Sequence, residues 1–288
     1  MARAAVKTGM VPTVLVAIEQ NFPKKDRIIR DDLAYSILPF AMRGIVWLTQ
    51  ISSIRNWVVG KIEKNAPGTW GGLLCRKRYI DEKLFNIVSE VDAVVNLGAG
   101  FDTRIYRVPG SIKSPAWEVD HNENIKPKQS RLNNLFGQIP NHIQLVPLDF
   151  DHDDLSSVLS ANGYSNDQQT FFIWEAVSQF LTEQGIRTTF NFLAKAAQGS
   201  YLAFTYVLKD FLNGDNLYRQ EKLYQQCVEK KIWLFGLYPR EVASFLKPYG
   251  WRIVEHHSYD DLAKKYIEPT GRNLPSLSVE RIVFAEKT

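Results

Sequence analysis

Short apolar runs and longer amphipathic stretches alternate along the chain from residue 91 onward. An apolar run of four to eight residues bounded by turn signals is typical of a strand buried on both faces of a sheet. Because helix-length segments separate the runs, the pattern predicts an α/β fold with a mostly parallel sheet covered by helices. We predict seven strands, at residues 93–97, 116–119, 143–148, 170–174, 201–207, 252–256 and 281–285, and helices near 122–136, 153–162, 182–197 and 240–248.

Residues 1–90 have the periodicity of helices. In 43–64 the apolar residues fall three or four apart, which places them on one helix face; they are Trp47, Ile51, Ile54, Val58 and Ile62. We expect this face to pack on the core as part of a cap, since the opposite face is not strongly basic; docking on a membrane or a partner is the alternative. Further helices are predicted at 12–20 and 78–90, with a loop at 66–72.

The expected organisation is one domain, with a helical cap at 1–90 and a core at 91–288. The segment 208–238 is longer than an ordinary connection between strands. We expect it to contribute a helix, at 216–231, to a substrate pocket. The last predicted strand closes the sheet, and a plain dinucleotide-binding domain has no such ending.

A glycine-rich turn follows the first predicted strand. Gly98-Ala99-Gly100 allows tight turning and close approach of a ligand to the backbone. Asp120 lies 22 residues after Gly98, at the predicted tip of the second strand. That spacing corresponds to a strand–turn–helix–strand unit whose acid binds the two hydroxyls of a ribose, so the sequence predicts a nucleoside site.

The residues after the turn indicate which nucleoside is bound. A dinucleotide site requires a third glycine where this chain has Thr103, and the neighbouring Asp102 would repel a phosphate. An acid there suits a ligand with a positive charge and no phosphate, such as S-adenosylmethionine (SAM). The alternative is that the glycines form only a loop between strand and helix.

Charge and cysteine content exclude several other classes of protein. The net charge is +4, and Arg76-Lys77-Arg78 is the longest basic run, so we expect no nucleic acid partner. Cys75 and Cys227 provide neither a disulfide framework nor a zinc site, and they fit a reducing compartment. With no signal-peptide pattern and no run of about 18 apolar residues, we expect a cytoplasmic protein without a membrane span. The acidic segment 149–154 lacks the glycine of a calcium loop, so no metal is expected.

Four short pieces of the chain resemble one family when taken together. They are Arg76-Lys77-Arg78-Tyr79-Ile80-Asp81, Asn96-Leu97-Gly98-Ala99-Gly100-Phe101-Asp102-Thr103-Arg104, Trp117-Glu118-Val119-Asp120, and Trp174-Glu175-Ala176-Val177 with Phe180-Leu181-Thr182. They resemble the leucine carboxyl methyltransferase family, especially its bacterial branch of SAM-dependent O-methyltransferases. The likeness extends from Lys7-Thr8-Gly9 to Tyr249-Gly250-Trp251. The chain departs from the family pattern at Asn122, where a proline is usual, and at Ala176, where glycine is frequent.

The resemblance implies a class I SAM-dependent methyltransferase with a Rossmann-like sheet and a helical cap, and S-adenosylhomocysteine (SAH) as product. Arg76, or alternatively Arg78, would bind the methionine carboxylate through a guanidinium fork. Glu175 would bind the ammonium group. The remaining cofactor contacts are expected at Gly98, Ala99, Gly100, Asp102 and Asp120, with the adenine at Asp149 and at the backbone amide of Phe150.

The expected reaction is methyl transfer from SAM to an oxygen of a small molecule in specialised metabolism, either a carboxylate or a hydroxyl. A hydroxyl acceptor generally needs a base, and the histidines are the candidates, but no motif places any of them at the site. No catalytic residue is therefore assigned. The rival functions are N- or C-methylation on the same scaffold, a nicotinamide-dependent oxidoreductase, and a SAM-binding protein without turnover. The acceptor and the oligomeric state stay open.

Overall fold

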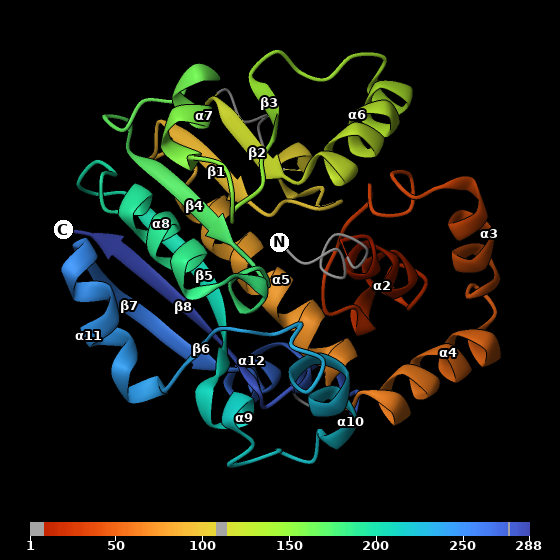
Figure 1. The fold of residues 1–288 in the computed structure, drawn as a ribbon. Coiled ribbons are helices and arrows are strands. Elements are labelled where there is room, and N and C mark those ends of the chain that lie inside the picture. Colours follow the sequence, from red (N-terminus) through yellow and green to blue (C-terminus); the bar gives the residue numbers. More distant parts are fainter. Residues whose placement is uncertain (1–8, 108–113, 276) are drawn as a thin grey trace.

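The computed structural model describes residues 9–107, 114–275 and 277–288 of the chain. Its strands form one sheet in the order β3-β2-β1-β4-β5-β8-β7 (Figure 1). All seven predicted strands are confirmed, and a short strand that was not predicted, β6 (Gly236–Leu237), pairs with β5. The seven are β1 (Ala93–Leu97), β2 (Ala116–Asp120), β3 (Ile143–Pro147), β4 (Thr170–Trp174), β5 (Tyr201–Leu208), β7 (Trp251–Ser258) and β8 (Glu280–Lys287).

The sheet is parallel from β3 to β5, whereas β8 runs antiparallel between β5 and β7. β1 is central: Asn96 is in register with Glu118 on β2 and with Ile173 on β4. The carboxyl ends of three parallel strands therefore meet at one edge of the sheet. This edge is where ligands bind in open α/β sheets.

Helices pack around the sheet and extend to one side of it (Figure 1). α5 is the longest, and α12 and α4 pack against it. The α-helices are α2 (Val11–Glu19), α3 (Phe40–Leu48), α4 (Ser52–Asn65), α5 (Thr69–Ile87), α6 (Asn122–Phe136), α7 (Leu155–Ala161), α8 (Glu183–Leu193), α9 (Lys209–Asn213), α10 (Glu221–Leu223), α11 (Val242–Leu246) and α12 (Tyr259–Tyr266). Within the described ranges, no helix combines the length and the apolar character that a bilayer crossing requires.

The single helix predicted at 43–64 is wrong, because the chain forms α3 and α4 with a break at residues 49–51. Nη1 of Arg55 donates to the carbonyl oxygens of Thr49 (3.2 Å) and Asn21 (2.9 Å). The Thr49 hydroxyl donates to the carbonyl of Val46 (2.6 Å). These side chains satisfy carbonyl groups that a continuous helix would have bonded internally, so the end of α3 is stable where it is.

The expectation that the apolar face of this segment packs on the core is confirmed for Val58 and Ile62 and wrong for Trp47 and Ile51. Trp47 and Ile51 remain more than half exposed, and Val46 alone in α3 is buried. Ile54, Val58 and Ile62 on α4 are partly buried. The core therefore holds α4 along one side and leaves most of α3 in contact with solvent.

Three local predictions are corrected. α5 begins at Thr69 and shortens the predicted loop, because the Glu63 carboxylate accepts bonds from the amides of Gly68 and Trp70 (both 2.7 Å). Between β1 and β2 the described residues contain a 3₁₀ turn, Arg104–Arg107, rather than an α-helix. The helix predicted at 216–231 is reduced to α10 and the π-helical turn Tyr224–Val228. Residues with positive φ angles bound this helical part, with Tyr218 and Arg219 before it and Lys231 after it.

Candidate functional site

A cavity of about 460 Å³ lies at the carboxyl ends of β1, β2 and β4. Its walls come from seven parts of the chain: residues 9–13, α5, the end of β1 with the glycine turn, the end of β2 with the start of α6, the residues after β4, the segment between β5 and β6, and residues 277–280. The volume falls in the range of small-molecule sites. Of the predicted cofactor residues, the cavity brings together Arg76, Gly98, Ala99, Gly100, Asp102, Asp120 and Glu175.

The glycine turn has no space for side chains. Gly98 has φ +76°, and a Cβ there would lie 2.1 Å from Cγ2 of Val177. Gly100 has φ +46°, and a Cβ there would lie 2.8 Å from the carbonyl oxygen of Gly9. The amino-terminal segment is held against the turn, because the Thr13 hydroxyl donates to the Phe101 carbonyl (3.0 Å). Both glycines are thus required for backbone conformation and for close packing.

Asp120 is buried at the end of β2 and faces this turn. Its Oδ2 accepts a bond from the amide of Gly100 (2.6 Å), and Oδ1 accepts bonds from the amide of His121 (2.6 Å) and Nδ2 of Asn124 (3.0 Å). Glu118, the other acid of β2, is buried outside the cavity lining against Nζ of Lys128 (2.8 Å). The acid in contact with the turn is therefore Asp120. Oδ1 already accepts two bonds, whereas Oδ2 accepts one and keeps a lone pair for a ligand hydroxyl.

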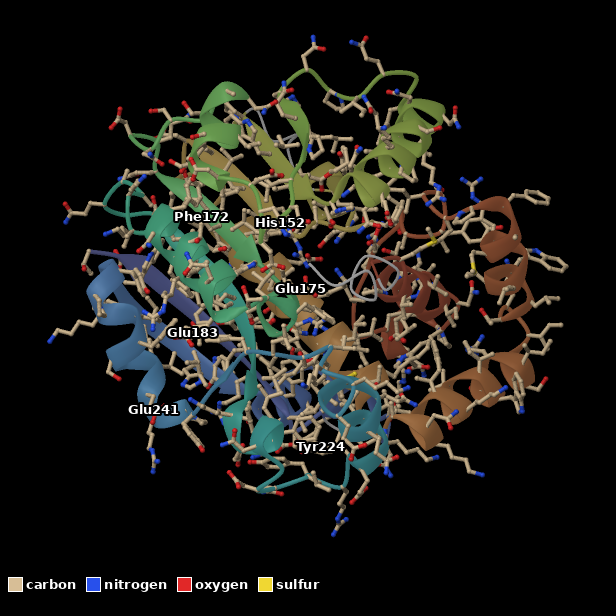
Figure 2. All side chains as sticks on the ribbon, viewed as in Figure 1. His152, Phe172, Glu175, Glu183, Tyr224 and Glu241 are labelled. Carbon is tan, nitrogen blue, oxygen red and sulfur yellow. The ribbon has the colours of Figure 1, made fainter. Side chains whose placement is uncertain are left out.

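Glu175 follows β4 near the centre of the molecule (Figure 2). Its Oε1 lies 2.8 Å from Nε of Arg76, and Oε2 lies 2.9 Å from Nη2 of Arg104 and 3.5 Å from Nζ of Lys77. Burial opposes ionisation of this carboxyl, but the charges of Lys77, Arg104 and Arg76 outweigh it and lower its pKa to about 2. Glu175 is therefore ionised and tightly bound at neutral pH.

Arg76 is buried between two carboxylates. Its Nη1 lies 3.0 Å from Oε2 of Glu280 on β8 and donates to the hydroxyl of Tyr259 on α12 (3.3 Å). Together with the contact to Glu175, these contacts engage Nε and Nη1 of the guanidinium. Among the described residues none bonds to Nη2 of Arg76.

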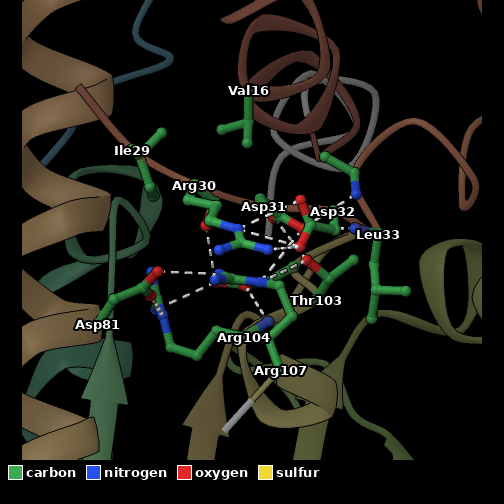
Figure 3. A network of polar contacts seen from close by, with 12 residues as sticks. Val16, Ile29, Arg30, Asp31, Asp32, Leu33, Asp81, Thr103, Arg104 and Arg107 are labelled. Carbon is green, nitrogen blue, oxygen red and sulfur yellow. Dashed lines mark hydrogen bonds and ion pairs between the residues drawn. The ribbon is translucent and has the colours of Figure 1, made fainter. Parts of the chain in front are cut away.

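Arg104 and Arg107 extend the charged cluster behind the cavity (Figure 3). Arg104 is fully buried; its Nε donates to Asp81 (2.7 Å), and its Nη1 forms an ion pair with Oδ2 of Asp102 (3.1 Å). Arg107 bonds Asp81 (2.9 Å) and Asp31 (3.2 Å). Burial opposes ionisation of Asp102, yet Arg104 and Lys77 hold its pKa well below the usual range. The turn is thereby fixed to α5 and to the end of β4.

Three predicted residues lie outside the cavity lining. Arg78 is on the far side of α5, where it bonds Glu82 (3.1 Å) and the Ile28 carbonyl (3.0 Å). Asp149 and Phe150 lie just beyond β3, next to the end of β2. Their proposed role at the adenine stays a prediction. Lys7 and Thr8, which carried part of the family resemblance, lie outside the described residues.

The remainder of the cavity is mostly apolar. It is lined by side chains from α5, from the residues after β4, from the segment between β5 and β6 and from the residues before β8, including Leu73, Phe180, Leu223, Ile232, Trp233 and Leu277. Two buried amide atoms of the lining have no hydrogen-bond partner, namely Nδ2 of Asn96 and Oε1 of Gln179. Unsatisfied buried polar atoms are rare and costly, so the pair indicates that a polar ligand completes the site.

Sequence reasoning missed Lys77, Asn96, Gln179 and Glu280. The helical period offers a signal for Lys77, since Leu73, Lys77 and Asp81 are four apart on the buried face of α5 and Arg78 is off that face. No sequence signal brings Glu280 to the site, because its position depends on the order of the strands.

Two further features bear on the chemistry. Ala176, the position where the family frequently has glycine, has φ +56°, a strained angle for a residue with a Cβ. Of the cavity-lining residues that the structure describes, none is a histidine. Tyr206 and Arg281 contact His256 outside the lining (2.8 and 3.1 Å from Nε2).

The lining fits SAM. Four carboxylates and two cations face the cavity, which suits a ligand with a net positive charge. Asp120 lies beside the turn, as a ribose-binding acid requires. The unpartnered Nδ2 of Asn96 provides a donor for a carboxylate or a ring nitrogen.

Comparisons with known proteins agree. The chain is 26% identical over 219 residues to a Bacillus subtilis protein named "Putative S-adenosyl-L-methionine-dependent methyltransferase YktD", covering 74% of this chain and 72% of the relative. It is 25% identical over 270 residues to a Mycobacterium tuberculosis protein with the same description, Rv3787c, covering 87% and 85%. The crystal structure of a Thermobifida fusca protein described as a methyltransferase superposes with a TM-score of 0.57 at 16% identity, covering 82% of this chain and 88% of that one, and supports the class I methyltransferase fold. The family model for leucine carboxyl methyltransferases matches residues 9–194. The chain therefore belongs to the leucine carboxyl methyltransferase family and is a SAM-dependent methyltransferase.

Proposed function

We propose that this enzyme methylates an oxygen of a small molecule, and that the oxygen belongs to a carboxylate rather than a hydroxyl. The observation that carries the proposal is that three of the four acids of the cavity, Asp102, Glu175 and Glu280, are already bound to cations. Glu175 has its pKa lowered to about 2 by Lys77, Arg104 and Arg76 against the opposing effect of burial. A carboxylate with so low a pKa is a weak base, and a hydroxyl acceptor would need a stronger one. A carboxylic acid acceptor is ionised at neutral pH and needs none.

The residues of the chain would act by placing the two reactants. SAM supplies an activated methyl group on its sulfonium. Asp120 is proposed to accept hydrogen bonds from the ribose hydroxyls. Arg76 is proposed to donate hydrogen bonds to the methionine carboxylate through Nη2. Glu175 stays the predicted partner of the ammonium group, in competition with the cations that it already binds. Alignment of the acceptor oxygen removes orientational entropy, which is worth up to about 7–11 kcal/mol of the barrier.

The apolar half of the cavity supports an apolar acceptor. Trp233, Phe180 and Ile232 provide its surface, and Oε1 of Gln179 provides one acceptor for a hydrogen bond. A small apolar carboxylic acid that carries a second polar group matches this lining. Such a molecule is consistent with a role in specialised metabolism.

The test is turnover of SAM carrying a radioactive methyl group with a panel of apolar carboxylic acids and their matched alcohols and amines. We expect a product with the acids that releases methanol in base, as a methyl ester does. Base-stable methylated alcohols, amines or carbon acids would contradict the proposal. SAH binding without turnover of any panel member would favour a protein that binds the cofactor and does not catalyse.

Asp120→Asn and Asp120→Ala test whether Asp120 binds the ribose of the cofactor. Asparagine retains an oxygen for the Gly100 amide, whereas alanine removes it. Because a hydrogen bond to a charged acceptor contributes about 1.5–3 kcal/mol, either variant is expected to weaken SAH binding at least tenfold by calorimetry. Unchanged affinity in both would remove Asp120 from the ribose site.

A further inference from the structure

Helices α3 and α4 present apolar side chains to solvent. Phe40 is 93% exposed, Trp47 57% and Trp57 63%. We define the apolar face by these residues together with Ile45, Leu48 and Ile51, which are each about half exposed. Figure 1 shows α3 and α4 at the edge of the molecule, with α2 between α3 and the sheet. A clustered set of large exposed apolar side chains marks an interaction surface.

The two helices are held in place even though this face is free. The Arg55 guanidinium and the Asn21 side chain bond carbonyl groups at the end of α3. Thr49, at the same end, is buried. The exposure of Trp47 and Trp57 is therefore a feature of the folded protein.

The charges beside the apolar face are all positive. Lys61 and Lys64 are exposed on α4, one and two turns after Trp57, and Nζ of Lys61 lies over the Trp57 ring (4.9 Å). Arg43 on α3 donates to the Leu38 carbonyl. None of these three cations forms an ion pair with a residue that the structure describes. Glu63, the one acid of the segment 40–65, bonds the first amides of α5.

We propose that the apolar face binds the surface of a membrane that contains anionic lipids. In this arrangement α3 lies in the plane of the surface, with Phe40, Trp47 and Leu48, which share one face of the helix, at the boundary between headgroups and acyl chains. Tryptophan is favoured at that boundary, and an amphipathic helix with a basic margin lies in it. Lys61 and Lys64 would bind lipid phosphates. With nine residues α3 is far too short to cross the bilayer.

Charge favours a lipid surface over a second copy of the chain. A symmetric dimer through this face would place the same patch against itself. The lysines of both copies would then lie along one interface with no exposed acid from this segment to pair with them. Like charges that face each other across an interface are costly, whereas an anionic leaflet attracts them.

The test uses the full chain and large unilamellar vesicles of phosphatidylcholine and phosphatidylserine in a two-to-one ratio. We expect the protein to sediment with these vesicles at low ionic strength, and less at high ionic strength or with phosphatidylcholine alone. Lys61→Gln and Lys64→Gln are expected to weaken binding about fivefold each. Trp47→Glu combined with Trp57→Glu is expected to abolish it.

Val254→Glu is the matched control, because Val254 is an exposed apolar residue on β7 and lies far along the chain from the face. This variant is expected to sediment like the parent, and every variant should keep the parent's affinity for SAH. Absence of binding to the anionic vesicles, or equal binding by the double tryptophan variant, would overturn the proposal. A dimer in solution that the tryptophan variant dissociates would also overturn it, by assigning the face to a second copy.

Discussion

At the scale of single residues, Arg76 is the informative position because it stabilises the fold and is also proposed to bind the cofactor. Two buried carboxylates, Glu175 and Glu280, bond it. Removing one partner of a buried ion pair costs about 3–5 kcal/mol, so Arg76→Ala would report on folding as much as on binding. A substitution that keeps the charge is the sharper experiment.

Arg76→Lys is predicted to weaken binding of SAM at least tenfold while leaving binding of decarboxylated SAM nearly unchanged. Lysine keeps the charge between Glu175 and Glu280 but cannot offer a further nitrogen in the plane of a guanidinium to the methionine carboxylate. Calorimetry with both ligands measures the difference. Arg78→Lys, two residues along α5 and outside the cavity lining, is the matched control and should change neither affinity. Equal losses for both ligands would show that Arg76 acts through folding alone.

At the scale of elements, the turn after β1 depends on two glycines whose side-chain positions are occupied by other parts of the chain. Gly98 and Gly137 share φ +76°, but a Cβ at Gly137 would meet no atom within 4 Å. The chain thus contains an internal control that separates the cost of the backbone angle from the cost of the contact.

Gly137→Ala is predicted to lower the free energy of unfolding by about 1–3 kcal/mol, the cost of holding an alanine in a sparsely populated conformation with positive φ. Gly98→Ala should lose about 1–3 kcal/mol more, because its methyl group overlaps Val177. Adding Val177→Ala to Gly98→Ala removes the overlapping methyl groups and should recover part of that loss. Denaturant unfolding of these three variants and of Val177→Ala alone measures the coupling, and equal losses at both glycines would contradict it.

The sequence predicts strands better than helices here, for a physical reason. A strand buried on both faces must be apolar throughout, so β1 and β4 are visible as runs such as Val94-Val95 and Phe171-Phe172-Ile173. The end of α3 depends instead on Arg55, a contact between segments that no local period reveals. Likewise the glycine turn and Asp120 were predictable from spacing, whereas Glu280 reaches the cavity only because β8 inserts beside β5.

At the scale of the whole molecule, His256 joins three strands, because it lies on β7 and contacts Tyr206 on β5 and Arg281 on β8. Both neighbours approach Nε2, so the ring is neutral with its proton on Nδ1. Burial and then the charge of Arg281 lower the pKa of this histidine to about 4. At any pH where the unfolded chain binds a proton that the folded chain does not, a fall in pH lowers the free energy of unfolding.

Between about pH 6.5 and pH 4 the unfolded chain binds a proton at residue 256 that the folded chain does not. The free energy of unfolding is therefore predicted to fall as the pH falls through this window. The loss from His256 should be on the order of 1–2 kcal/mol, since solvent screens part of the effect on a half-buried ring. Denaturant unfolding at several pH values measures it. His256→Gln should flatten this part of the profile relative to His152→Gln, a substitution at an exposed site, and identical slopes would refute the assignment.

The position of β8 has a consequence for synthesis on the ribosome. Residues 280–287 are made after the other described strands, yet they pair with both β5 and β7 and bring Glu280 to Arg76. A nascent chain that ends after β7 has no strand to connect β7 to the sheet, and its Arg76 lacks one of two carboxylates. The cofactor cavity is thus completed only after β8 has been made, and a nascent chain that stops before β8 cannot form it.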